Sequence, residues 1–157
     1  MGIYSCVYPI PSPVLAMAPT PASREVPIVL VADDIEIHRS LAATLLEGFG
    51  LTAHTVSNGQ EAIDAACGLQ PDLILMDCRM PHMDGLAATR VLRRLHNTNA
   101  LPYAPIIGLS AGVDPALVLR ARDAGMDACL AKPLRRLPLQ RALDRYGLFR
   151  PNVPCVA

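Results

Sequence analysis

Residues 71–85 of the chain read Pro71-Asp-Leu-Ile-Leu-Met-Asp77-Cys-Arg-Met-Pro81-His-Met-Asp-Gly85. The apolar run 73–76 predicts a buried strand that ends on the carboxylate of Asp77, and Pro81 and Gly85 predict a tight loop directly after it. A carboxylate at the rim of a sheet is costly unless water, a partner or a metal ion compensates its charge. Taken alone, the segment is explained equally well by an aspartate that only ends a strand and caps the next turn.

Three further apolar runs end on polar residues in the same way. They are 26–32, followed by Asp33 and Asp34, 105–109, followed by Ser110, and 127–131, followed by Lys132. Segments of helical period lie between the runs, as in the stretch 37–49, where an apolar residue recurs every four positions. Strands that alternate with helices predict right-handed crossovers, and therefore an α/β fold with a parallel sheet covered on both faces.

The polar residues at the strand ends are expected to meet. In such a sheet the carboxyl ends of all strands open on one edge, where ligands bind. We therefore expect one crevice to hold Asp33, Asp34, Asp77, Ser110 and Lys132. Clustered carboxylates favour a hard divalent cation, and Mg²⁺ fits better than Zn²⁺ because no His or Cys nearby has metal-ligand spacing. An ammonium and a hydroxyl suit the oxygens of a phosphoryl group, so the set predicts phosphoryl transfer to a carboxylate.

These positions resemble the receiver domain of two-component response regulators, the module that takes a phosphoryl group from a phosphohistidine. The resemblance spans roughly residues 26–147. It implies a flavodoxin-like (βα)5 fold, a doubly wound parallel sheet of five strands in the order 2-1-3-4-5 with five helices. The motif around Asp77 and the loop 97–105 are more similar to receivers attached to hybrid sensor kinases than to those of DNA-binding regulators. Besides the acids, the matching motifs are Met80-Pro81-x-Met83-Asp84-Gly85, Ser110-Ala111 and Lys132-Pro133.

The resemblance assigns the acidic residues to the phosphoacceptor and the metal site. Asp77 would be the phosphoacceptor. Asp34 and Asp77 would ligate Mg²⁺ directly, and Asp33 would act mainly through a bound water. The backbone carbonyl of Arg79 would supply a further oxygen ligand.

The resemblance also implies how the attached phosphoryl group is held and where it comes from. Ser110 would hydrogen-bond the group, Lys132 would pair with it, Ala111 would leave space for it, and the Lys132–Pro133 peptide bond would be cis. The donor would be a histidine kinase or a histidine phosphotransfer protein, and a downstream effector protein is a further candidate partner. The chain would then be a switch that catalyses its own phosphorylation, not a metabolic enzyme; slow autodephosphorylation stays open.

Cys129 departs from the family pattern. Three residues before the lysine the family usually carries Tyr or Phe, an aromatic that turns inward when the hydroxyl residue moves toward the phosphoryl group. A thiol cannot report in that way, which puts in doubt the usual coupling to the surface of the fourth helix and fifth strand, though not the phosphorylation chemistry. A buried core residue is the simplest interpretation of Cys129, because free cysteines are usually buried.

Two other functions are compatible with parts of the pattern. The first is a pseudo-receiver, a protein-binding module that works without phosphorylation; Cys129 favours it slightly, and the intact acids, Ser110 and Lys132 count against it. The second is an aspartyl-phosphate hydrolase of another α/β family. That family needs a second aspartate two residues after the nucleophile, and Arg79 stands there instead.

Composition narrows the class further. The 157 residues are 52% hydrophobic, enough for one domain with an ordinary core. Fourteen basic and fourteen acidic residues balance, so no nucleic-acid partner is indicated, and the arginines at positions 90, 93 and 94 are interpreted as a solvated or partner-facing surface. Five cysteines without a Cys-x-x-Cys pair indicate a reduced, cytoplasmic compartment. The four histidines are interpreted as surface or loop residues: His38, His54, His82 and His96.

The two ends of the chain differ from the middle. Residues 1–25 carry five prolines in an otherwise apolar stretch, which predicts a flexible, partly polyproline-like leader. The breaks and the lack of positive charge before Arg24 argue against a signal peptide or a membrane span. Residues 26–147 are predicted to form the receiver domain and 148–157 a short tail.

Overall fold

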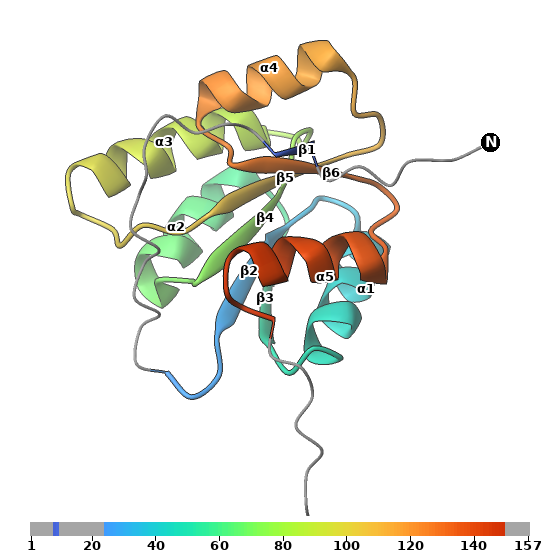
Figure 1. Cartoon of the computed structure of the whole chain (residues 1–157). Helices are drawn as coiled ribbons and strands as arrows, with labels where there is room; N and C mark the ends of the chain where they lie inside the picture. Colours follow the sequence, from blue (N-terminus) through green and yellow to red (C-terminus); the bar gives the residue numbers. More distant parts are fainter. Residues whose placement is uncertain (1–7, 10–23, 150–157) are drawn as a thin grey trace, which may run out of the picture.

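The computed structural model describes residues 8–9 and 24–149 and shows an α/β fold with one central sheet (Figure 1). Five strands run parallel in the order β3-β2-β4-β5-β6. When the extra strand β1 is left out and these five are numbered along the chain, this is the predicted order 2-1-3-4-5, which is confirmed. The strands are β1 (Tyr8–Pro9), β2 (Ile28–Ala32), β3 (Thr52–Val56), β4 (Leu73–Asp77), β5 (Ile106–Ser110) and β6 (Ala128–Ala131). The helices are α1 (Glu36–Glu47), α2 (Gly59–Leu69), α3 (Gly85–Asn97), α4 (Pro115–Ala124) and α5 (Arg136–Arg145).

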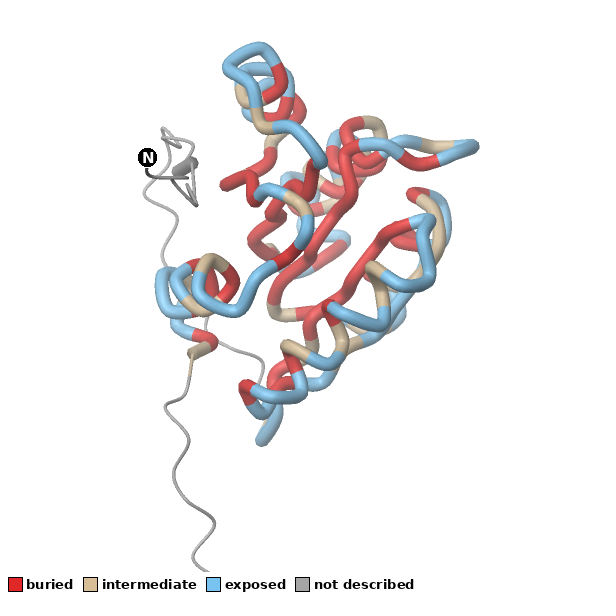
Figure 2. Tube along the Cα trace, turned by 90° about the vertical axis from the view of Figure 1, so that its right-hand side faces the viewer, coloured by how far each residue is buried: buried red, intermediate tan, exposed pale blue. Residues whose placement is uncertain are grey.

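The sheet divides the core into two halves, and helices cover each of them. α1 and α5 cover one face of the sheet, and α2, α3 and α4 cover the other (Figure 1). The central strands β4 and β5 are buried along their whole length, whereas β3 at the edge is largely exposed. Figure 2 shows the buried strands enclosed by helices whose outer sides are exposed. The near-continuous apolar runs of the sequence are those of a parallel sheet covered on both faces.

The helix starts on the two faces are built differently. Three helices begin at a side-chain cap, because Asn58, Asp84 and Asp114 each accept a hydrogen bond from a backbone N–H in the first turn of α2, α3 and α4. α1 has no such cap; instead the carboxylate of Asp33 accepts the N–H of Ile35 at 2.9 Å. The start of α1 is thereby tied to the acid that follows β2.

Gly85 allows α3 to begin directly behind the predicted phosphoacceptor. A side chain at this position would collide with the backbone carbonyl of Asp77. The glycine that the loop motif carries is therefore a steric requirement of the close approach between the helix and the strand end.

The ends of the chain add one strand that the sequence did not predict. β1 pairs antiparallel with the edge strand β6 and places Tyr8 opposite Cys129. Proline is tolerated at such an edge. The rest of the predicted leader up to residue 23 and the tail from residue 150 lie outside the described residues, so the division into leader, domain and tail stays a prediction. No helix in the described part of the chain is long and apolar enough to cross a membrane.

Candidate functional site

The predicted polar residues meet at the carboxyl edge of the sheet. Asp33 and Asp34 follow β2, Asp77 ends β4, Ser110 ends β5 and Lys132 follows β6. Carboxylate oxygens of the three aspartates all lie within 4.8 Å of one another. Polar residues from strand ends spread over about a hundred positions of the sequence thus meet at one edge, as the topology predicts.

Lys132 occupies the centre of this cluster. Its Nζ lies 2.6 Å from Oδ2 of Asp33 and 2.7 Å from Oδ2 of Asp77. Both acids are almost completely buried, with relative exposures of 1% and 5%. Burial by itself favours the neutral amine, but the hydrogen bonds and charges of the two aspartates outweigh it and raise the pKa of Lys132. The lysine therefore stays charged and partly neutralises two acids at once.

The carboxyl group of Asp77 is held from both sides. Oδ1 accepts a hydrogen bond from the backbone N–H of Arg79 at 3.0 Å, and Oδ2 accepts one from Lys132. Burial nevertheless raises the pKa of Asp77, against these hydrogen bonds and the charge of Lys132, and the neighbouring charge of Asp33 raises it further. In the absence of an added cation, this acid is held in a setting that disfavours its charge.

The remaining predicted residues stand around this centre. Asp34 is exposed, and the side chain of Arg79 is exposed as well. The buried hydroxyl of Ser110 donates a hydrogen bond to the carbonyl of Gly112 at 2.9 Å, so it points into its own loop. The Lys132–Pro133 bond is cis, as the resemblance implies. Cys129 is fully buried in β6, which agrees with its interpretation as a core residue.

His38 belongs to the site, although it was predicted to be a surface or loop residue. Its Nδ1 lies 3.2 Å from Oδ1 of Asp33 and 3.3 Å from Nζ of Lys132. Its side chain is 34% exposed, so it does lie at the surface; because the loop after Asp34 is short, the first turn of α1 also folds back over the acid that precedes it. A histidine within one helical turn of a strand-end acid pair is the sequence signal that could have found it.

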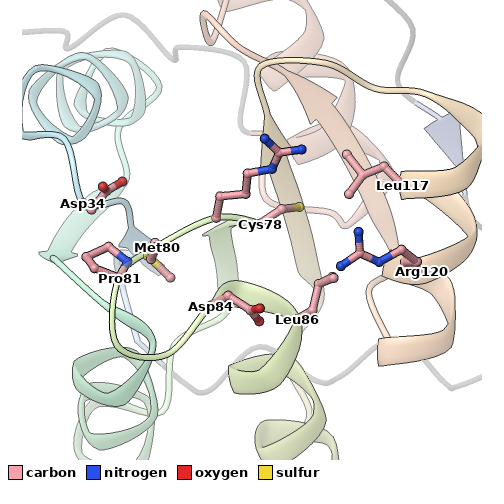
Figure 3. Close-up of a pocket in the computed structure, with 9 residues that line it drawn as sticks. Asp34, Cys78, Met80, Pro81, Asp84, Leu86, Leu117 and Arg120 are labelled. Atoms are coloured by element: carbon pink, nitrogen blue, oxygen red, sulfur yellow. The ribbon is translucent and has the colours of Figure 1, made fainter.

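An open pocket of about 430 Å³ adjoins the acidic cluster. It lies between the loop after β4 and the helices α3 and α4, and Figure 3 shows side chains from all of these elements around it. Asp34 marks the side nearest the cluster, and Arg120 of α4 marks the opposite side. The pocket beside the cluster thus has acidic and basic walls.

Comparison with known proteins gives this geometry a family. A model of the response regulator receiver domain matches residues 29–144. The chain belongs to the receiver-domain family. Two curated relatives of this receiver domain are hybrid signal transduction histidine kinase A of Dictyostelium discoideum, 33% identical over 119 residues, and sensor histidine kinase RcsC of Escherichia coli K12, 33% identical over 120 residues. These matches cover 75% and 76% of this chain, but only 6% and 12% of the relatives.

Solved receiver structures agree with the fold and with the hybrid-kinase type. The receiver domain of sensor histidine kinase PA1611 from Pseudomonas aeruginosa PAO1 is 34% identical with a TM-score of 0.69, and the match covers 77% of this chain and 97% of that one. That structure holds a magnesium ion in the active-site cleft. The receiver domain of histidine kinase CKI1 from Arabidopsis thaliana, in complex with Mg²⁺ and BeF₃⁻, is 29% identical with a TM-score of 0.69, and covers 77% and 89%. Receiver domains are phosphorylation switches, and the class predicted from the residues is confirmed.

Proposed function

We propose that this receiver domain takes a phosphoryl group onto Asp77 from a phosphohistidine of a histidine kinase or a histidine phosphotransfer protein, with Mg²⁺ as cofactor. One observation carries the proposal: Asp77 is a buried carboxylate that contacts Lys132 at 2.7 Å and lies within 4.8 Å of two further carboxylates. The site thus brings together a nucleophile, acids that can bind a cation, and a charged hydrogen-bond donor. Transfer of a phosphoryl group to a carboxylate requires these groups close to one another.

The donor set fits Mg²⁺. Asp33, Asp34 and Asp77 offer only carboxylate oxygens, the hard ligands that this ion prefers, and the backbone carbonyl of Arg79 is proposed as a fourth. Two similar receivers were crystallised with this ion. When bound, the ion supplies positive charge that offsets the acidic cluster and the incoming phosphoryl group.

Asp77, Lys132 and Ser110 have different roles in the transfer of the phosphoryl group. An oxygen of Asp77 attacks the phosphorus, the phosphorus–nitrogen bond of the phosphohistidine breaks, and its electron pair stays on the imidazole. Lys132 gives up part of its contact with Asp33 and Asp77 and pairs with the transferred oxygens. Ser110 rotates from the carbonyl of Gly112 toward the same group. Both residues then contact a ligand that only the modified state contains, so phosphorylation biases the conformation of the loops that carry them.

Exposed apolar side chains beside the acid pair support a protein as the phosphoryl donor. Ile37 of α1 is 72% exposed, and Ile35 and Leu41 are exposed as well. An apolar patch next to a polar site is typical of a surface that another protein covers. The partner, any downstream effector and the cytoplasmic location all belong to this proposal, as does the role of a switch without metabolic activity.

Phosphorylation by acetyl phosphate with Mg²⁺ tests the assignment. Intact-mass spectrometry should show one phosphoryl group on the wild-type protein and on Asp64→Asn, whose exposed acid on α2 is a matched control, and none on Asp77→Asn. An equal mass gain in Asp77→Asn would remove Asp77 from the role. No gain in any variant, with binding of a kinase intact, would favour the pseudo-receiver, for which the missing aromatic at Cys129 is the specific argument.

A further inference from the structure

The two outer strands of the parallel sheet differ in burial. Most residues of β3 are exposed, whereas β6 buries Ala128, Cys129 and Leu130 completely between the two halves of the core and carries no charged side chain. A strand that is buried on both faces but has a free edge is a template for pairing with another chain, because the N–H and C=O groups along that edge have no partner. The edge of β6 therefore has to be covered if the protein is to stay a monomer.

The short strand β1 lies along this edge of β6 (Figure 1). The two strands pair antiparallel, with Tyr8 opposite Cys129 and Pro9 opposite Ala128. Opposed residues of an antiparallel pair alternate between those that exchange two hydrogen bonds and those that exchange none. Because Pro9 has no N–H, the alternation assigns the two backbone hydrogen bonds to Tyr8 and Cys129. A strand from the same chain thus satisfies the backbone of Cys129.

The prolines of the leader suit a strand that ends a sheet. Since the backbone groups of Tyr8 face β6, those of Pro9 face away from the sheet, where a further strand would need the N–H that proline lacks. Pro11 and Pro13 follow in the sequence at the same two-residue spacing. An extended segment with this spacing can donate hydrogen bonds from one edge only. Such a strand covers an edge without offering a new row of donors.

We propose that residues 8–9 of the leader are a cover that prevents β6 from pairing with β6 of a second copy of this chain. The edge accepts an antiparallel strand, and two copies of β6 related by a two-fold axis normal to the sheet also run antiparallel. A second copy therefore offers the strand direction that this edge already accepts, with the same buried and uncharged side chains. Displacing the cover converts the monomer into a dimer with one continuous sheet. This role does not depend on phosphorylation of Asp77.

The test uses the full chain in reducing buffer. Tyr8→Pro removes the N–H that pairs with Cys129, whereas Tyr8→Thr keeps it and Ala16→Pro adds a proline elsewhere in the leader. Sedimentation velocity over a concentration series should show that Tyr8→Pro becomes dimeric as its concentration rises. The wild-type protein and the two control variants should remain monomers over the same series.

Residue-resolved amide hydrogen exchange distinguishes an opened cover from a general loss of stability. In dilute samples that sediment as monomers, the amide of Cys129 should exchange at least about tenfold faster in Tyr8→Pro than in the wild-type protein. The amide of Leu130 faces β5, because backbone groups alternate along the strand, and it should exchange at the same rate in both proteins.

Four results would overturn the proposal. They are equal exchange of the Cys129 amide in the wild type and Tyr8→Pro, a Tyr8→Pro variant that stays monomeric at every concentration, a Tyr8→Thr variant that behaves like Tyr8→Pro, and a wild-type protein that is itself a dimer. The last result would mean that β1 of one copy covers β6 of the other.

Discussion

The two ends of the sheet each bury charged side chains, and they treat those charges in opposite ways. At the carboxyl end one ammonium, Lys132, faces two buried acids, and Oδ2 of Asp33 has the ion pair but no hydrogen bond of good angle. At the amino end one guanidinium, Arg93, faces one acid, Asp127, at 2.5 Å. At the first end the acids outnumber the ammonium, which agrees with the proposed binding of a cation and a phosphoryl group, whereas at the second end one cation matches one acid.

At the amino end, all three side-chain nitrogens of Arg93 and both carboxylate oxygens of Asp127 make hydrogen bonds. Arg93 of α3 donates to the backbone carbonyls of Gly125 and Ala104 at 2.7 and 2.9 Å. Asp127 accepts from the hydroxyl of Tyr103 at 2.7 Å and from the backbone N–H of Ile106 at 2.8 Å. The network joins α3, the loop before β5 and the loop before β6, which makes it a structural clamp rather than a binding site.

Breaking the clamp should have the largest effect on stability. Arg93→Met keeps the apolar stem but leaves the carboxylate of Asp127, which is 11% exposed, without its cation. Loss of the cation from a largely buried pair typically costs about 3–5 kcal/mol of unfolding free energy. Urea unfolding measures this loss, and Arg94→Met, one residue on and exposed, should change stability by less than about 0.5 kcal/mol. A similar small loss in both variants would show that the amino end is no more tightly coupled than an ordinary surface.

The sequence allowed the residues at the carboxyl end of the sheet to be predicted, but not the network at the amino end. Asp33, Asp77 and Lys132 could be predicted because each stands at the end of an apolar run, and topology brings such ends together. The partners of Arg93 come from loops with no fixed spacing, so interpreting Arg93 as a solvated surface residue was wrong. Strand β1 was missed for the same reason, because nothing in a proline-rich stretch indicates which edge it will meet.

A second way to test the clamp is through pH. Nδ1 of His96 lies 2.9 Å from Nη1 of Arg93, and its Nε2 is buried without a partner. Burial, and then the charge of Arg93, lower the pKa of His96 from 6.5 to about 4. Between pH 6.5 and about 4, His96 is therefore protonated in the unfolded chain but neutral in the folded protein. The unfolding free energy is highest above pH 6.5 and falls by about 3 kcal/mol in total as the pH is lowered to about 4.

Urea unfolding at several pH values checks this dependence. His96→Asn, which can still accept from Arg93 but does not titrate, should lose most of the slope between pH 6.5 and 4. His54→Asn, with an exposed side chain on β3, should keep the wild-type slope. If the two variants behave alike, the low pKa of His96 does not govern acid unfolding.

At the carboxyl end, removing a charge should leave the protein stable. Asp34 is exposed, so Asp34→Ala should change the unfolding free energy in the absence of metal by less than about 0.5 kcal/mol, or raise it by relieving repulsion between like charges. The same change should remove the stabilisation by Mg²⁺, which for a ligand at a hundred times its Kd amounts to about 2.7 kcal/mol. Thermal melts with and without Mg²⁺ measure both effects, with Asp64→Ala as control; equal shifts in all three proteins would contradict a role for Asp34 in metal binding.

The smallest effect is expected at His38, which contacts both Asp33 and Lys132. One nitrogen, Nδ1, faces both Oδ1 of Asp33 and Nζ of Lys132, and it can either donate to the acid or accept from the ammonium, but not both. Either contact helps the ammonium to leave the acids and reach a phosphoryl group: a hydrogen bond donated to Asp33 offsets part of that acid's charge, and one accepted from Lys132 positions its Nζ. His38→Leu removes this guide at a cost of about 1 kcal/mol, or about fivefold in the rate of phosphorylation by acetyl phosphate. His38→Asn offers a donor and an acceptor on a shorter side chain and should restore most of that rate, while His54→Leu should have none of the effect. Equal slowing in the Leu and Asn variants would mean that the imidazole only fills space beside Lys132. Asp33 and Asp77 alone would then position the lysine.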